Sequence, residues 1–252
     1  MTLAEQLYEL RFNILRDRSD MIAGDTDSLW SDETLLRYIG DAERRFARKT
    51  LLLRDSTTPE IVRVLLKTGV KTYPLHRSVL SVLSARAAGY DYDLRRSGRC
   101  LVEATVPDEF LSFDPASPYL ISPGATLAFY TDETLVYDRR NVVTLSVYPA
   151  PSATENDTTI NMRVIRVPKT QYLAEELEKE SELPEDYQLD VLEWAAYRAQ
   201  RSFDGDAGAP TTSQDHKRAF DETVEQAKKE TKQKIFAPTG FRFGSNGFSW
   251  PR

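Results

Sequence analysis

The sequence has few of the features that mark a secreted protein or a membrane protein. It contains a single cysteine, Cys100, among 252 residues, so no disulfide can form within the chain, which is typical of proteins from a reducing compartment. No stretch approaches the roughly 20 apolar residues that a membrane-spanning helix needs. The first residues also lack a basic segment followed by an apolar run, so we expect neither a secretion signal nor a membrane partner.

Signatures of catalysis are equally scarce. The only two histidines, His76 and His216, are far apart in the sequence and fall in different predicted elements. The chain has no Gly-x-Ser-x-Gly elbow, no phosphate loop of the Gly-x-x-x-x-Gly-Lys type and no zinc or calcium ligand spacing. We therefore predict that the protein is not an enzyme, with no catalytic residues and with no cofactor or metal.

The overall composition is that of a globular protein. Hydrophobic residues make up 40% of the chain and charged residues 29%, and the length allows one large domain or two small ones. The formal net charge is −6, which opposes general adhesion to nucleic acid because the phosphate backbone is itself negative.

The most regular pattern in the chain is a helical stripe between Glu182 and Phe203. Apolar residues recur there at alternating steps of three and four, which places them on one face of an α-helix. They are Leu189, Leu192, Ala196, Ala199 and Phe203. Pro184 suits the first turn, and the sequence DGDAGAP after Phe203 ends the helix.

A second stripe runs beside the first on the same predicted helix. It consists of Tyr187, Val191, Trp194 and Arg198. One apolar stripe is enough to join a helical core, so we predict that the second one contacts another subunit. The alternative is that Tyr187 and Trp194 form the rim of the subunit's own core.

Three further helices are expected. The first is expected from Leu3 to Met21 and has the apolar stripe Leu3, Leu7, Leu10 and Ile14. The second helix begins after Ser31, which is a good N-cap, and has the stripe Leu35, Ile39, Ala42 and Phe46. The last is expected from Ser213 to Phe236, with Phe220, Val224, Ala227 and Ile235 on its apolar face.

A basic cluster lies at the end of the second predicted helix and consists of Arg44, Arg45, Arg48 and Lys49. The helix dipole explains cations at that end, and a phosphate-binding strip is the alternative.

Between Pro59 and Pro168 the pattern changes to short β-strands. The candidates are 61–66, 70–73, 79–85, 126–130, 134–137, 142–148 and 159–167, with the first two joined through Thr68 and Gly69. Short strands without long helices between them predict an antiparallel domain, either a sandwich or a small barrel. A helical turn is expected at 106–113, and the acidic connector 171–181 is a further helical candidate.

These elements define an α+β fold. We expect a four-helix bundle formed by residues 1–58 and 169–237, with an antiparallel β-domain, 59–168, inserted between the second and third main helices. Residues 238–252 form an extended C-terminal tail rich in glycine, aromatic residues and arginine, with no acidic residue. Such a segment is typical of an interaction site, and the alternative is a tail folded back on its own bundle.

Several segments resemble head-to-tail adaptor (connector) proteins of tailed double-stranded DNA bacteriophages. The resemblance rests on two helical regions and on the last strands before the third main helix. The helical segments are 29–36, 42–50, 182–187 and 192–198, and the strand segments are 147–151 and 163–168. The matching patterns are those of helices and strands, so they carry over no catalytic residue.

The resemblance implies a structural virion protein at the head-tail junction, made in the cytoplasm of the bacterial host. Such proteins form a ring, usually a dodecamer, below the portal; the ring joins the capsid to the tail and continues the DNA channel. The expected partners are copies of the same chain, the portal protein, a tail or nozzle protein, and genomic DNA that passes through the lumen without specific binding. The tail residues expected to bind the portal are Phe241, Arg242, Phe243, Phe248, Trp250 and Arg252.

Two other functions fit the same elements. One is a β-sandwich that binds a glycan or a protein and is carried on a helical stalk. The other is a hydrolase of cell-wall polymers, for which the chain offers no motif.

Overall fold

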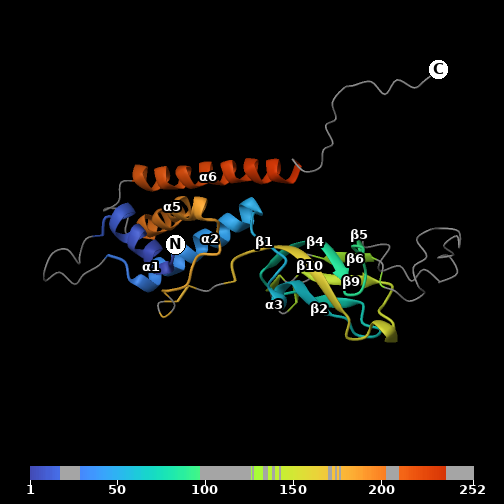
Figure 1. Ribbon diagram of the computed structural model, residues 1–252. Helices are drawn as coiled ribbons and strands as arrows, with labels where there is room; N and C mark the ends of the chain where they lie inside the picture. Colours follow the sequence, from blue (N-terminus) through green and yellow to red (C-terminus); the bar gives the residue numbers. More distant parts are fainter. Residues whose placement is uncertain are drawn as a thin grey trace, which may run out of the picture.

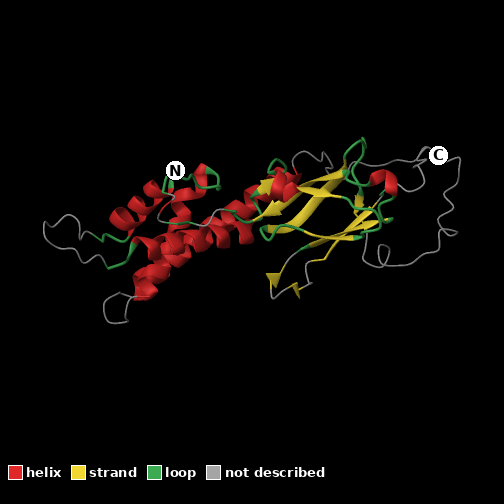
Figure 2. Cartoon of the chain, turned by 90° about the horizontal axis from the view of Figure 1, so that it is seen from below, coloured by secondary structure: helices red, strands yellow, loops and turns green. Residues whose placement is uncertain are grey.

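The computed structural model describes most of the helices and strands and leaves several connecting segments undescribed. The described residues are 1–17, 29–96, 126, 128–132, 136–137, 140–141, 143–169, 172–173, 175, 177–202 and 210–236. Helices gather at one end of the molecule and β-strands at the other, as two views at right angles agree (Figures 1 and 2).

The helical part combines the two ends of the chain. It contains α1 (Leu3–Tyr8) with its π-helical continuation η1 (Glu9–Ile14), α2 (Asp32–Thr50), α5 (Glu185–Ser202) and α6 (Pro210–Phe236). All of them contribute to one cluster of buried hydrophobic residues, so segments about 200 residues apart in sequence share one core. An α+β fold is confirmed, while the structure does not establish the arrangement of a four-helix bundle.

Aromatic rings fill the centre of the helical core. Phe46 is fully buried, and its ring centroid lies 5.3 Å from that of Tyr187 and 6.4 Å from that of Phe220. The ring centroid of Trp194 lies 5.3 Å from that of Phe220. The predicted core residues Leu35, Ile39, Phe46, Leu192, Phe220 and Val224 are all buried in this cluster, as expected.

The predicted start of α2 is confirmed. The Ser31 side chain accepts a hydrogen bond from the backbone N–H of Thr34, with N to Oγ at 3.3 Å. This bond satisfies one of the free donors at the helix N-terminus. At the other end, Leu51 takes a left-handed conformation with φ of 53° and ends the helix.

Two helical predictions are wrong, and others fall outside the described part of the chain. Leu189 was expected in the core but is 50% exposed, whereas Leu192, Ala196 and Ala199 of the same predicted stripe are buried. The first helix ends at Ile14 rather than Met21, since Arg16 adopts a φ of 56° that no right-handed helix continues. Phe203, Ile235 and the whole 238–252 tail lie outside the described residues or side chains.

The described β part contains two four-stranded sheets and a two-stranded ribbon. In the first, β10 (Thr159–Arg166) pairs antiparallel with β1 (Arg54–Asp55), β2 (Arg63–Leu65) and β4 (Val79–Ala87). The second has the order β3-β9-β6-β5, formed by β3 (Thr72–Pro74), β9 (Thr144–Tyr148), β6 (Ala128–Asp132) and β5 (Arg95–Arg96). A separate ribbon pairs β7 (Val136–Tyr137) with β8 (Arg140–Asn141).

The two sheets share a second hydrophobic core. Val82 and Val164 of the first sheet belong to the same buried cluster as Leu145 and Val147 of the second. The predicted sandwich-like packing is therefore present. This cluster has no residue in common with the helical core. Whether the β part folds as a separate domain stays a prediction.

The strand predictions need three corrections. The expected strand 61–66 begins as a helical turn, α3 (Pro59–Val62), because Pro59 at the first position favours a helix start. Thr68 and Gly69 connect strands of different sheets, so they form no hairpin between them. β5 pairs with β6 in parallel, which departs from a purely antiparallel domain. A 3-10 turn, η4 (Ala153–Glu155), precedes β10, and the turn expected at 106–113 lies outside the described residues.

Candidate assembly site

Arg166, at the end of β10, links the helical and β parts by hydrogen bonds to residues on both sides of their junction. Its Nε donates to Oδ2 of Asp55 at 2.6 Å, and its Nη1 donates to the carboxylate of Glu182, just before α5. The side chain of Arg166 is only 11% exposed and that of Asp55 only 3%. One guanidinium thus joins the segment that enters the β part to the segment that leaves it.

Asp55 is held by its local backbone as well as by Arg166. Its Oδ1 accepts from the N–H of Thr57 at 2.9 Å and from the N–H of Thr58 at 3.0 Å. Burial alone would raise the pKa of this carboxyl, but these bonds and Arg166 outweigh it and hold the pKa well below its ordinary value. The site therefore keeps Asp55 ionised.

A second group of buried hydrogen bonds lies in the helical part, around the carboxylate of Glu43 of α2. Its carboxylate accepts from the Ser181 hydroxyl at 2.6 Å, from Gln6 Nε2 at 3.2 Å and from the Tyr172 hydroxyl. Burial raises the pKa of Glu43, and the three hydrogen bonds only partly offset this effect. Through this carboxylate, described residues of the 171–181 connector are tied to α1 and α2. The described residues of that connector form no α-helix, in contrast to the prediction.

Of the four residues predicted to lie between subunits, three are buried within the subunit. Tyr187, Val191 and Trp194 are at most 5% exposed, so the alternative that places Tyr187 and Trp194 in the subunit's own core describes their packing. Trp194 Nε1 donates to Asp41 at 3.0 Å, and Arg198 donates to the same oxygen at 3.2 Å. Arg198 is 45% exposed, and a contact of this set with another subunit stays a prediction.

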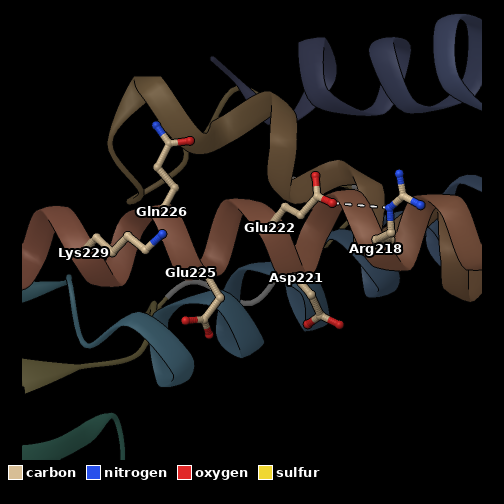
Figure 3. A pocket seen from close by; sticks show the side chains of 6 residues that line it. All are labelled: Arg218, Asp221, Glu222, Glu225, Gln226 and Lys229. Atoms are coloured by element: carbon tan, nitrogen blue, oxygen red, sulfur yellow. Dashed lines mark ion pairs between the residues drawn. The ribbon is translucent and has the colours of Figure 1, made fainter.

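The outer face of α6 is polar and slightly hollowed (Figure 3). Six side chains from this one helix line the hollow, and Arg218 pairs with Glu222 at 3.3 Å. They are Arg218, Asp221, Glu222, Glu225, Gln226 and Lys229. Because every lining residue comes from a single exposed helix face, the hollow suits contact with a large partner better than enclosure of a small ligand.

Neither a metal site nor a membrane-spanning helix is found in the part of the chain that the structure describes. Within the described ranges, no group of three or more His, Cys, Asp or Glu residues is placed to hold a metal ion. The described helices also include none that is long and apolar enough to cross a membrane. The six residues predicted to bind the portal, from Phe241 to Arg252, lie outside the described residues.

The sequence reasoning missed Arg166, Asp55 and Glu43. Asp55 followed by Ser, Thr, Thr and Pro is a turn signal that pointed to its local bonds. Glu43 beside the apolar position Ala42 gave a weaker signal, since a carboxylate on the core side of a helix requires partners. Nothing local in the sequence identifies those partners.

The described structure thus combines a helical part with a two-sheet β part, joined by buried polar contacts at Arg166. The chain belongs to the SU10 adaptor protein family, whose model matches residues 2–241. No match was found among curated proteins. Family membership makes this chain a bacteriophage structural adaptor, a virion component that interacts with other virion components such as portal and tail proteins.

Proposed function

We propose that the protein is a head-to-tail adaptor that forms a ring below the portal, joins the capsid to the tail and continues the DNA channel. The observation that carries this proposal is the family match over residues 2–241, nearly the whole chain. The ring is proposed to be a dodecamer, as the resemblance to connector proteins implies. DNA is proposed to pass through its lumen without specific binding.

The hydrogen bonds that join the helical and β parts support a role in transmitting force between capsid and tail. An adaptor between a capsid and a tail transmits force, so its parts must keep a fixed relation. Arg166 ties Asp55 to Glu182, and Glu43 ties the following connector to α2 and to Gln6 of α1. Buried hydrogen-bonded pairs specify geometry because breaking one leaves an unpaired charge out of water.

The aromatic tail is proposed to anchor the ring to the portal. Its residues are Phe241, Arg242, Phe243, Phe248, Trp250 and Arg252. One tail alone pays a cost in ordering its glycine-rich chain, but many tails on one ring bind together and gain from effective concentration.

The mass of the assembled protein tests the ring. Purified full-length protein, studied by mass photometry over a range of concentrations, should show one discrete oligomer with the mass of twelve chains. A stalked binding module would remain a monomer or a small oligomer. A single monomer peak at the highest concentration would contradict the proposed ring.

A further inference from the structure

Four arginines line the face of α2 that points away from the helical core. Arg37, Arg44, Arg45 and Arg48 are all exposed, and their spacing places them on one stripe of the helix. Fully buried residues such as Phe46 occupy the opposite face. We call these four residues the arginine stripe.

The helix dipole accounts for only part of this stripe. The dipole acts within the last turn, which covers Arg48 but not Arg37 or Arg44. Among the described residues, none of the four arginines forms an ion pair within 4.0 Å. The acids on or next to this face are Glu33, one turn before the stripe, and Asp41, which already accepts from Trp194 and Arg198. The stripe thus presents positive charge on an acidic protein.

The stripe suits a protein partner better than nucleic acid. The guanidinium of Arg45 lies 3.9 Å from the centroid of the Trp194 ring, and that of Arg37 lies 5.7 Å from the Tyr38 ring. Stacking on rings restrains these side chains, which lowers the entropy lost on binding. Arginine beside aromatic residues is typical of the strongest contacts in protein interfaces. The net charge of −6 opposes the approach of DNA.

A complementary surface exists on the first turns of α5. Glu185, Asp186 and Asp190 are exposed there around Leu189, which is itself 50% exposed. We call these four residues the acidic patch. The dipole favours acids in the first turn, but Asp190 lies beyond it.

The acidic patch and the arginine stripe are different surfaces of the subunit, since one lies on α5 and the other on α2. On α5, Leu189 lies on the side opposite Arg198, whereas Asp190 and Asp186 lie about 80° and about 120° around the helix from Arg198. Arg198 donates to Asp41, an acid of α2 next to the arginine stripe, at 3.2 Å. Two different complementary surfaces are what a head-to-tail contact between identical copies requires, and such contacts generate rings when the rotation closes.

We propose that the arginine stripe of one copy docks on the acidic patch of the next copy. Arg44 and Arg48 are one helical turn apart, as are Asp186 and Asp190, so two packed helices can match both pairs at about 6 Å spacing. Leu189 supplies apolar contact between them. This inference rests on the proposed ring and names the surfaces that close it.

A charge-swap experiment tests these surfaces on the full chain. One variant carries Arg44→Glu and Arg48→Glu, and the other carries Asp186→Arg and Asp190→Arg. Each variant alone places like charges across every contact, so the concentration needed for half-assembly should rise about tenfold or more. An equimolar mixture restores opposite charges at each contact when copies alternate. Native mass spectrometry should then show rings with equal numbers of the two variants.

A matched control and the alternatives complete the design. Lys67→Glu with Lys71→Glu makes the same change in charge on exposed residues of the β part and should leave assembly unchanged. If wild type forms rings and both variants alone form them equally well, the docking surfaces are wrong while the proposed ring stands. If the arginine variant keeps its rings but loses retardation of duplex DNA in a gel, the stripe binds phosphate and the proposal fails. If wild type forms no ring, both the proposed function and these surfaces are overturned.

Discussion

Gly40 of α2 lies against the ring of Tyr172. A Cβ atom added at Gly40 would stand 2.6 Å from Cδ2 of Tyr172, closer than two carbon atoms can approach. The same tyrosine donates its hydroxyl to Glu43, one turn further along α2. Gly40 therefore allows the connector before α5 to lie against α2 at this point.

The first prediction follows from this contact. Gly40→Ala should lower the free energy of unfolding by about 1–2 kcal/mol, because overpacking outweighs the gain of about 1 kcal/mol in helix propensity. In a Tyr172→Ala background the same change should instead stabilise the protein, since the clash is gone. Chemical denaturation of the four proteins checks the change of sign. A stabilising Gly40→Ala in the wild-type background would contradict the packing.

The second prediction compares two leucines on one helix. Leu192→Ala should cost about 2–5 kcal/mol, because Leu192 is fully buried in the helical core. Leu189→Ala, a matched change at a half-exposed position, should cost much less, roughly 0.5 kcal/mol. Phe46→Ala should resemble Leu192→Ala or exceed it. Thermal melts monitored by circular dichroism separate the two outcomes, and equal effects of the two leucine variants would place the core elsewhere.

The third prediction concerns the buried carboxylate Glu43. Burial raises its pKa in the folded protein above the ordinary value of 4.5, so the folded state holds its proton more tightly than the unfolded state does. The favourable contribution of that proton is complete below pH 4.5 and is lost as pH rises through the folded pKa. Glu43→Gln removes this titration. The stability of the variant relative to wild type should therefore increase from pH 4.5 upward.

Urea denaturation of both proteins between pH 3 and pH 8 measures this difference. Asp55 gives the opposite sign, since its lowered pKa makes stability fall as pH drops below its ordinary value of about 4. Glu43 and Asp55 are thus distinguished by the sign of the change in stability with pH, as well as by the effect of the Glu43→Gln variant. A stability difference between Glu43→Gln and wild type that does not change with pH would show that Glu43 is not the group concerned.

The fourth prediction tests the division into domains. Replacing residues 59–168 by a short Gly/Ser linker should leave the helices folded, because the helical and β cores have no buried residue in common. Removal of Arg166 leaves Asp55 and Glu182 without their shared partner, so some loss of stability is expected. Helical circular dichroism and solubility provide the measurement. An insoluble or unfolded product would mean that the two parts depend on each other to fold.

The fifth prediction concerns the C-terminal tail. Deletion of residues 238–252 should leave the melting temperature unchanged but abolish recovery of the protein on immobilised portal. Replacing Arg242 and Arg252 by Gln should have a smaller effect than replacing Phe241 and Trp250 by Ala, because exposed ion pairs contribute little. Equal recovery of the full-length and truncated proteins would move the portal contact to the helical part.

The sequence was most informative where structure depends on near neighbours. Ser31 was identifiable as a cap because its bond reaches only to Thr34, and the spacing of Phe220 and Val224 revealed the buried face of α6. Leu189 was misplaced because steps of three and four describe several overlapping stripes on α5. Which stripe turns inward depends on α2 and α6, which lie far away in the sequence.

The buried hydrogen bonds of the candidate site join residues far apart in the sequence, so no local pattern predicts them. Tyr172 and Glu43 are 129 residues apart, and Arg166 and Asp55 are 111 residues apart. The individual residues looked ordinary in the sequence, and only the fold brings them together. The arginine stripe could be predicted in part. The sequence showed the cluster Arg44, Arg45 and Arg48, but only the structure showed that these residues and Arg37 share one exposed face of α2.

The central claim is that this chain forms a ring that attaches to the portal, and direct imaging tests it best. Full-length protein mixed with purified portal should be examined by negative-stain electron microscopy, beside portal alone. The account predicts a second ring stacked coaxially on one end of the portal, with an open channel through both. Portal particles that are indistinguishable from those without the protein, at concentrations well above assembly, would contradict it.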